Sequence, residues 1–148
     1  MNIVACVVFI TLVATRAEIA CAADWQNVPG NSVKADLSRI EVRKDGSRRV
    51  WQRYTLDPTI VARLQADLRS RGSAVNYDGY AYSVALWEYH CKDRLIGVVS
   101  TADYDGSGRV VNSSETDPPE RQRAIPESDG ENTLEFVCAW RNQRNPKK

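Results

Sequence analysis

The positions of the four cysteines constrain this fold more than any other feature of the sequence. Cys6 and Cys21 lie in the N-terminal region, whereas Cys91 and Cys138 lie far along the chain. If the N-terminal region is removed on export, two cysteines remain. An even count in an oxidising compartment is typical of a structural disulfide. Closing the loop between them contributes about 4 kcal/mol in the chain-entropy estimate. We therefore predict a Cys91–Cys138 disulfide.

The alternative is that Cys91 is a reactive thiol. The one histidine of the chain, His90, is its immediate neighbour. Both residues lie in a predicted strand, where successive side chains point to opposite faces of the sheet. This geometry is poor for a catalytic Cys–His pair, so the disulfide is favoured.

The first residues predict an export signal. Ile3–Ala14 is almost entirely apolar but too short to span a bilayer, and Ala20-Cys21-Ala22 has the small residues that signal peptidase requires. We predict a signal peptide over residues 1–22; a buried N-terminal strand or helix is the alternative. Lipid attachment to Cys21 is disfavoured, because Glu18 occupies the position where lipoprotein signals usually carry Leu.

Composition predicts one globular domain. The chain has 148 residues, 43% of them hydrophobic, and a formal net charge of +1. These values suit a single domain over residues 23–141 followed by a basic tail over residues 142–148. The near-neutral charge argues against a dedicated nucleic-acid binder, and a single histidine excludes zinc sites that need two. The sequence also predicts no transmembrane segment.

Local patterns predict an α+β fold, with a small antiparallel sheet and a C-terminal helix packed on it. Asp45-Gly46 between alternating β-formers predicts a hairpin within residues 37–56. The aromatic and β-branched stretches 80–91 and 94–104 predict two further strands. Asp57-Pro58 predicts the start of a helix that ends near Gly72 and covers part of the sheet or its edge.

The C-terminal helix is predicted from a capping box, Ser128-x-x-Glu131. Leu134, Val137, Cys138 and Arg141 then recur at helical spacing, so Cys138 lies on the apolar face. Such a helix would rest on the sheet and be tied to it through the disulfide.

Basic residues alternate with apolar ones along the predicted hairpin. A solvated outer sheet face is the ordinary interpretation of this pattern. Our hypothesis for a binding site is that Arg48, Arg49, Trp51 and Arg53 contact an acidic partner.

One segment resembles part of a calcium-binding loop. Asp103, Asp105, Ser107 and Gly108 match its first positions, but Ser114 stands where the bidentate Glu is required. A glycine-rich hairpin turn accounts for the same residues and is favoured. The sequence carries no motif for a nucleophile, a phosphate loop or a dinucleotide turn, so we predict no metal, no cofactor and no catalytic residue.

A series of short motifs runs in order along the chain beyond residue 22. They are Ala23-Asp24-Trp25, Ser38-Arg39-Ile40, Gly46-x-Arg48-x-Val50-Trp51, Tyr82-Ser83, Glu88-Tyr89-x-Cys91-Lys92, Gly106-x-Gly108-x-Val110-Val111, Ile125-Pro126-x-Ser128 and Val137-Cys138. Together they resemble the surface-adhesin protein E-like domain of Gram-negative bacteria. Three departures stand out. His90 replaces a common Asp, no Trp occurs in 117–123, and the segment 57–77 is longer than usual.

The resemblance implies a small antiparallel sheet with a helix tied down by a disulfide, exposure at the cell envelope, and attachment to host matrix or plasma proteins. Fold similarity does not transfer a binding site, so no binding residue is carried over. We expect an exported, non-catalytic, adhesin-like binding module, secreted or on the outer-membrane surface, with protein partners. A periplasmic binding or inhibitor-like protein is the alternative, and the sequence leaves a homo-oligomer open.

Overall fold

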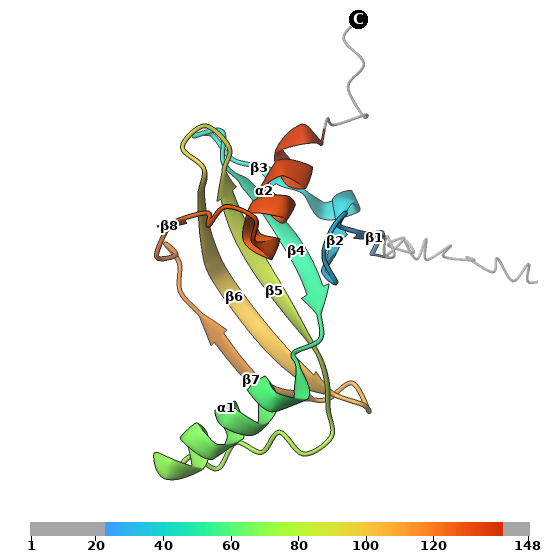
Figure 1. Cartoon of the computed structure of the whole chain (residues 1–148), viewed down its shortest axis with the longest axis vertical. Helices are drawn as coiled ribbons and strands as arrows, with labels where there is room; N and C mark the ends of the chain where they lie inside the picture. The colour runs from blue at the N-terminus through green and yellow to red at the C-terminus, as the bar shows by residue number, and fades with distance from the viewer. Residues whose placement is uncertain (1–22, 141–148) are drawn as a thin grey trace, which may run out of the picture.

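The computed structural model describes residues 23–140, which form one antiparallel sheet with two α-helices (Figure 1). The strand order is β1-β2-β4-β5-β6-β7, with β3 paired to β4 and β8 paired to β6. The predicted α+β class is confirmed. The strands are β1 (Trp25–Asn27), β2 (Lys34–Asp36), β3 (Glu41–Val42), β4 (Arg48–Tyr54), β5 (Tyr80–His90), β6 (Leu95–Asp105), β7 (Val110–Glu115) and β8 (Gln122–Arg123), and the helices are η1 (3-10, Leu37–Arg39), α1 (Pro58–Ser70) and α2 (Asp129–Ala139).

The predicted hairpin forms between β3 and β4. Asp45 accepts hydrogen bonds from the backbone N–H and the hydroxyl of Ser47, at 2.9 and 2.6 Å. Gly46 follows with a φ of +81°, a conformation that glycine adopts without a steric penalty. This turn sets the register that pairs Glu41 with Arg49. The two long strands predicted next are also present, as β5 and β6.

Helix α2 packs on one face of the sheet, as predicted. Its residues Leu134 and Val137 are fully buried and belong to the same core cluster as Val50 and Tyr89 of the sheet. The disulfide between Cys91 and Cys138 is confirmed and joins the end of β5 to this helix. The described helix ends at Ala139, so the predicted position of Arg141 on its apolar face lies outside the described residues.

The start of α2 differs in one detail from the predicted capping box. The hydroxyl of Ser128 accepts a hydrogen bond from the N–H of Glu131 at 3.2 Å, as expected. The carboxylate of Glu131, however, accepts from the N–H of Glu127 and also pairs with Arg94. The N–H of Ser128 is instead satisfied by the carbonyl of Ile125, which explains the shift by one residue.

Helix α1 begins as predicted, with Asp57 accepting from the N–H of Thr59 at 2.8 Å and Pro58 in its first turn. It lies past one end of the sheet rather than across a face (Figure 1). The side chain of buried Gln65 binds the backbone of Val75 and Tyr77, so the helix is held by the segment that leads into β5. The expectation was that it covers part of the sheet or its edge; in the structure it lies at the end of the strands.

Three short strands were not predicted. β1 and β2 form a hairpin at the sheet edge, and β8 lies inside the proline-containing connection 117–126. Strands of two or three residues carry too little periodicity to be recognised without their partners. The predicted signal peptide and the predicted tail both lie outside the described residues.

Candidate binding surface

Strand β4 divides the four predicted contact residues between the two faces of the sheet. Arg48 shares its face with Val50, beneath α2, whereas Arg49, Trp51 and Arg53 point to the other side. Both helices lie on the viewer's side of the sheet in Figure 1. We call the side opposite α2 the open face.

Arg48 is engaged with α2. Its guanidinium donates to the carbonyl of Val137 and, at 2.7 Å, to that of Trp140. The last carbonyls of a helix lack internal partners and carry partial negative charge, so a cation there stabilises the helix end. Arg48 therefore has a structural role in the geometry of this domain.

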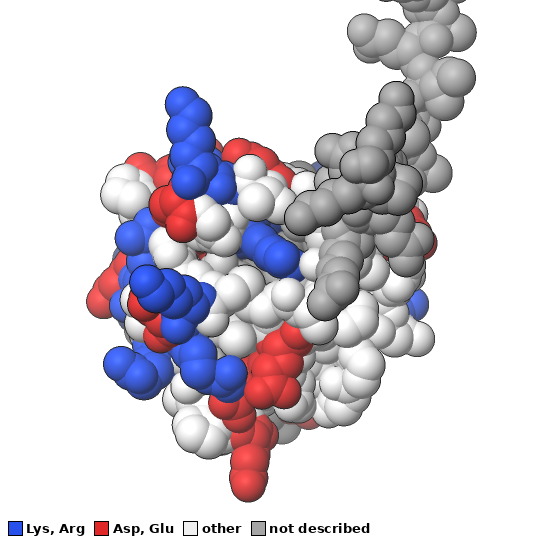
Figure 2. Space-filling model, turned by 90° about the horizontal axis from the view of Figure 1, so that it is seen from above, with Lys and Arg blue, Asp and Glu red and all other residues white. Residues whose placement is uncertain are grey.

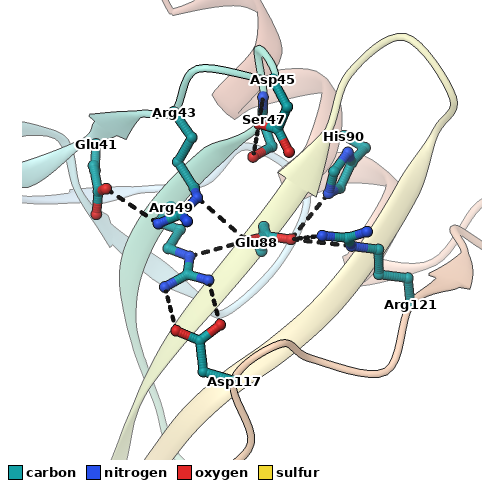
Figure 3. Close-up of polar contacts among 9 residues, drawn as sticks. All are labelled: Glu41, Arg43, Asp45, Ser47, Arg49, Glu88, His90, Asp117 and Arg121. Carbon is teal, nitrogen blue, oxygen red and sulfur yellow. Dashed lines mark hydrogen bonds and ion pairs between the residues drawn. The ribbon is translucent and has the colours of Figure 1, made fainter.

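Arg49 is buried in an ion-pair network at one end of the open face, centred on Glu88 (Figure 3). Its Nε donates to Glu88 Oε2 at 2.9 Å, and its two terminal nitrogens hold both oxygens of Asp117 at 3.0 and 2.7 Å. Glu88 Oε1 also accepts from Arg121 at 2.9 Å and lies 2.9 Å from His90 Nε2. Both oxygens of this carboxylate are therefore occupied.

The network keeps its carboxylates ionised. Burial alone would raise the pKa of Glu88, but hydrogen bonds from His90, Arg49 and Arg121 outweigh it and hold the pKa below its ordinary value. The hydrogen bonds from Arg49 likewise lower the pKa of Asp117. A buried carboxylate with hydrogen bonds to both of its oxygens is suited to holding chain segments together rather than to accepting a proton from a substrate.

The partners of Arg49 explain how the chain crosses this end of the open face. Asp117 and Arg121 bracket a segment that passes over Gly97 of β6, where an added Cβ would lie 2.8 Å from the carbonyl oxygen of Glu120 and 3.1 Å from Pro119. The absence of a side chain at Gly97 allows this close approach. The ion pairs thus clamp the segment 117–121 onto the sheet.

Beyond this network, aromatic and aliphatic side chains gather on the part of the open face formed by β4, β5 and the end of β6. They are half-buried, whereas Arg53 among them is exposed. The Arg53 guanidinium carbon lies 3.9 Å from the centre of the Tyr82 ring, and Tyr82 stacks on Tyr104 with ring centres 5.0 Å apart. The residues of this part of the face, which we call the aromatic face, are Trp51, Arg53, Tyr82, Val84, Leu86 and Tyr104. Two of the four predicted contact residues, Trp51 and Arg53, belong to it.

The segment that resembles part of a calcium loop forms the turn between β6 and β7. Asp105 Oδ1 accepts from the N–H groups of Ser107 and Arg109 at 2.9 and 3.0 Å. Asp103 instead binds Tyr77 and Ser83, each at 2.5 Å. The two carboxylates are thus used by different parts of the fold. Within residues 23–140 there is no group of three or more His, Cys, Asp or Glu side chains that could hold a metal ion.

Figure 2 looks onto the end of the sheet that carries the β3–β4 and β5–β6 turns. Lys and Arg gather on one side of this end, with Asp and Glu interspersed. Arg43 lies 3.9 Å from Glu88 Oε2 and 3.3 Å from Glu41, and Arg121 pairs with Glu88 as described above. These two cations are therefore compensated within the fold.

Comparison with known proteins identifies the family. A family model described as surface-adhesin protein E matches residues 25–139. The chain belongs to the surface-adhesin protein E family. Two solved structures of Haemophilus influenzae protein E are similar in fold, each with a TM-score of 0.51. One is 14% identical, covering 78% of this chain and 83% of that one, and the other, in crystal form II, is 15% identical, covering 78% and 87%. No curated protein matches the sequence.

Membership of a surface-adhesin family indicates an exported or surface protein that binds other proteins, rather than an enzyme. The described part of the chain contains no helix long and apolar enough to cross a membrane. At 14–15% identity, the protein E structures support the fold and leave the binding residues of this chain to be argued from its own geometry.

Proposed function

We propose that this protein is an adhesin-like module, secreted or on the outer-membrane surface, that attaches to host matrix or plasma proteins through its aromatic face. The observation that carries the proposal is the aromatic face itself. In this chain, the aromatic and aliphatic side chains of the aromatic face lie on the side of the sheet opposite α2. Because the chain belongs to a surface-adhesin family, such a face is a candidate for binding a protein.

The composition of the aromatic face fits a protein partner. Trp, Tyr and Arg are the residues most enriched among those that dominate binding energy at protein interfaces. Trp51, Tyr82 and Tyr104 have few rotatable bonds, and Arg53 is already ordered over Tyr82, so binding would cost little side-chain entropy. A half-buried apolar sheet surface is suited to a broad protein contact rather than to enclosing a small molecule.

The binding test uses residues 23–148 and a panel of immobilised matrix and plasma proteins, measured by biolayer interferometry. Trp51→Ala should weaken any binding by about tenfold or more, the effect expected at an interface hot spot. Ile125→Ala is the control, because Ile125 is exposed but lies outside the aromatic face. Absence of binding to the whole panel, or equal affinities for wild type and Trp51→Ala, contradicts the proposal.

The alternative function is that of a periplasmic binding protein. Protease treatment of intact cells separates the two, with a known periplasmic protein as the leakage control. Selective digestion supports the proposed adhesin-like function. Protection until the outer membrane is broken supports the periplasmic alternative.

A further inference from the structure

Lys34 of β2 and Arg53 of β4 face each other directly across the two strands on the open face. Like charges in this arrangement repel. Within residues 23–140, neither side chain has a carboxylate at ion-pair distance, whereas Arg43, Arg49 and Arg121 all have one. This pair is therefore an uncompensated positive centre at the margin of the aromatic face.

A groove of about 450 Å³ lies beside these two cations. It lies at the end of the β2–β4 pairing, which stops at Lys34 and Arg53. The residue before Lys34, Val33, accepts a hydrogen bond at its carbonyl from the N–H of Val28 at 2.9 Å. The groove, which we call the Lys34–Arg53 groove, is lined by Ser32, Lys34, Arg53, Tyr54, Thr55, Ala81 and Tyr82.

We propose that the Lys34–Arg53 groove binds an acidic segment of the partner protein. A carboxylate between the two cations would remove their repulsion, and the guanidinium of Arg53 offers the planar fork that matches a carboxylate. The hydroxyl of Ser32 can donate to a second oxygen or to the partner's backbone, whereas that of Thr55 donates to the carbonyl of Ala81 at 3.5 Å. This inference rests on the proposed function, because it takes the carboxylate to belong to a protein partner.

Two features of the groove favour a peptide over a sulfated polysaccharide. It presents two cations rather than the extended basic stripe that a polyanion requires. Tyr82 lines the groove and also stacks on Tyr104, so the groove adjoins the apolar part of the aromatic face. The surface thus fits an acidic residue followed by an apolar one, which is a protein pattern rather than a carbohydrate one.

The test is a titration of isotope-labelled protein, residues 23–148, with hexaglutamate at low salt, followed by NMR amide shifts. Low salt is needed because exposed charges are screened within about 10 Å at 0.1 M ionic strength. The expected shifts centre on residues 32–34, 53–55 and 81–82. Shifts centred on the turns at the opposite end of the sheet, or no shifts at millimolar peptide, overturn the inference.

Charge-reversal variants locate the interaction. Arg53→Glu and Lys34→Glu should each weaken hexaglutamate binding at least about tenfold, and Arg53→Lys should retain part of it. Lys44→Glu is the matched control, because Lys44 is equally basic and exposed but lies in the β3–β4 turn; a change below about twofold is expected. Circular dichroism and thermal unfolding establish that each variant is folded. Equal effects of the three reversals contradict a specific groove.

Two further measurements separate this inference from the proposed function. If hexaglutamate binds the groove but no matrix or plasma protein binds the domain, the acidic-peptide site stands and the proposed function fails. If a host protein binds and Arg53→Glu leaves its affinity unchanged, the proposed function stands and the groove assignment fails. A sulfated heparin hexasaccharide that binds the groove more tightly than hexaglutamate also overturns the choice of a peptide.

Discussion

Arg49 and Glu88 form a buried ion pair, with Arg49 Nε 2.9 Å from Glu88 Oε2, although the two residues are 39 positions apart in the sequence. The pair lies on neighbouring strands, directly opposite in register. Through Asp117 and Arg121, it connects the central sheet to the segment that crosses Gly97. The stability of this end of the domain therefore depends on one carboxylate.

Replacement of that carboxylate should be strongly destabilising. Glu88→Gln leaves Arg49 buried with part of its charge uncompensated, and we expect the free energy of unfolding to fall by about 3 kcal/mol. Urea denaturation measures the change. Asp67→Asn is the control, because Asp67 pairs with Arg71 on the exposed surface of α1, where such pairs contribute about 0–1 kcal/mol. Equal effects of the two substitutions would show that the network is not a structural clamp.

Asp105 makes stability depend on pH. The hydroxyl of Ser107 and the N–H of Arg109 lower its pKa from 3.8 to about 2. The unfolded chain therefore binds a proton at a higher pH than the folded one. The contribution is present in full above about pH 4 and is lost as the pH falls toward 2. Asp105→Asn should reduce the slope of unfolding free energy against pH in this window, and Ser107→Ala should reduce it in part. Parallel curves for all three proteins would contradict this.

The disulfide between Cys91 and Cys138 should carry a large part of the stability. Substituting both cysteines by Ser removes a cross-link between residues 47 positions apart, and we expect a loss of about 4 kcal/mol. Urea denaturation measures the loss. Hydrogen exchange should show the largest decrease in protection in α2, because this helix is tied to β5 through the bond. A decrease spread evenly over the sheet would contradict the proposed anchoring of α2.

Gly97→Ala tests the crossing of the open face. The new Cβ would lie 2.8 Å from a backbone oxygen of Glu120, which cannot move without displacing the clamped segment. We expect a loss of about 2 kcal/mol of unfolding free energy. Gly130→Ala is the matched control, because there the new Cβ meets the flexible end of Ile96 and alanine favours the helix. The unfolding free energy of Gly130→Ala should be close to that of wild type. A larger loss of unfolding free energy for Gly130→Ala than for Gly97→Ala would contradict the packing argument.

The sequence predicted the elements that carry local signals. The turn at Asp45-Gly46, the caps at Asp57 and Ser128 and the two long strands are defined by residues within a few positions of each other, and each is present. The disulfide was predictable because Cys91 and Cys138 are the two cysteines that lie beyond the predicted signal peptide. β1 and β2 were missed because each has three residues and exists through its pairing.

The candidate site was predicted less well, for a physical reason. Arg49 has the same local pattern as Arg53, because both are basic residues in an alternating strand on the same face. What distinguishes them is the partner. Glu88 and Asp117, 39 and 68 positions away from Arg49, are brought to it by the sheet, whereas Arg53 meets Tyr82 and Lys34. No pattern within the hairpin contains that information.

This contrast gives the last prediction. Arg49→Ala leaves Glu88 buried without one of its two arginines at 2.9 Å and should lower the free energy of unfolding by about 3 kcal/mol. Arg53→Ala removes an exposed side chain whose contact with a tyrosine ring is worth about 0.5–1 kcal/mol, so its effect should be small. Urea denaturation compares the two. If Arg53 serves binding, as proposed, Arg53→Ala should weaken attachment to a partner while the domain remains as stable as wild type within that margin. If Arg53→Ala instead destabilised the fold as much as Arg49→Ala, Arg53 would belong to the structural framework and would have to be removed from the proposed binding surface.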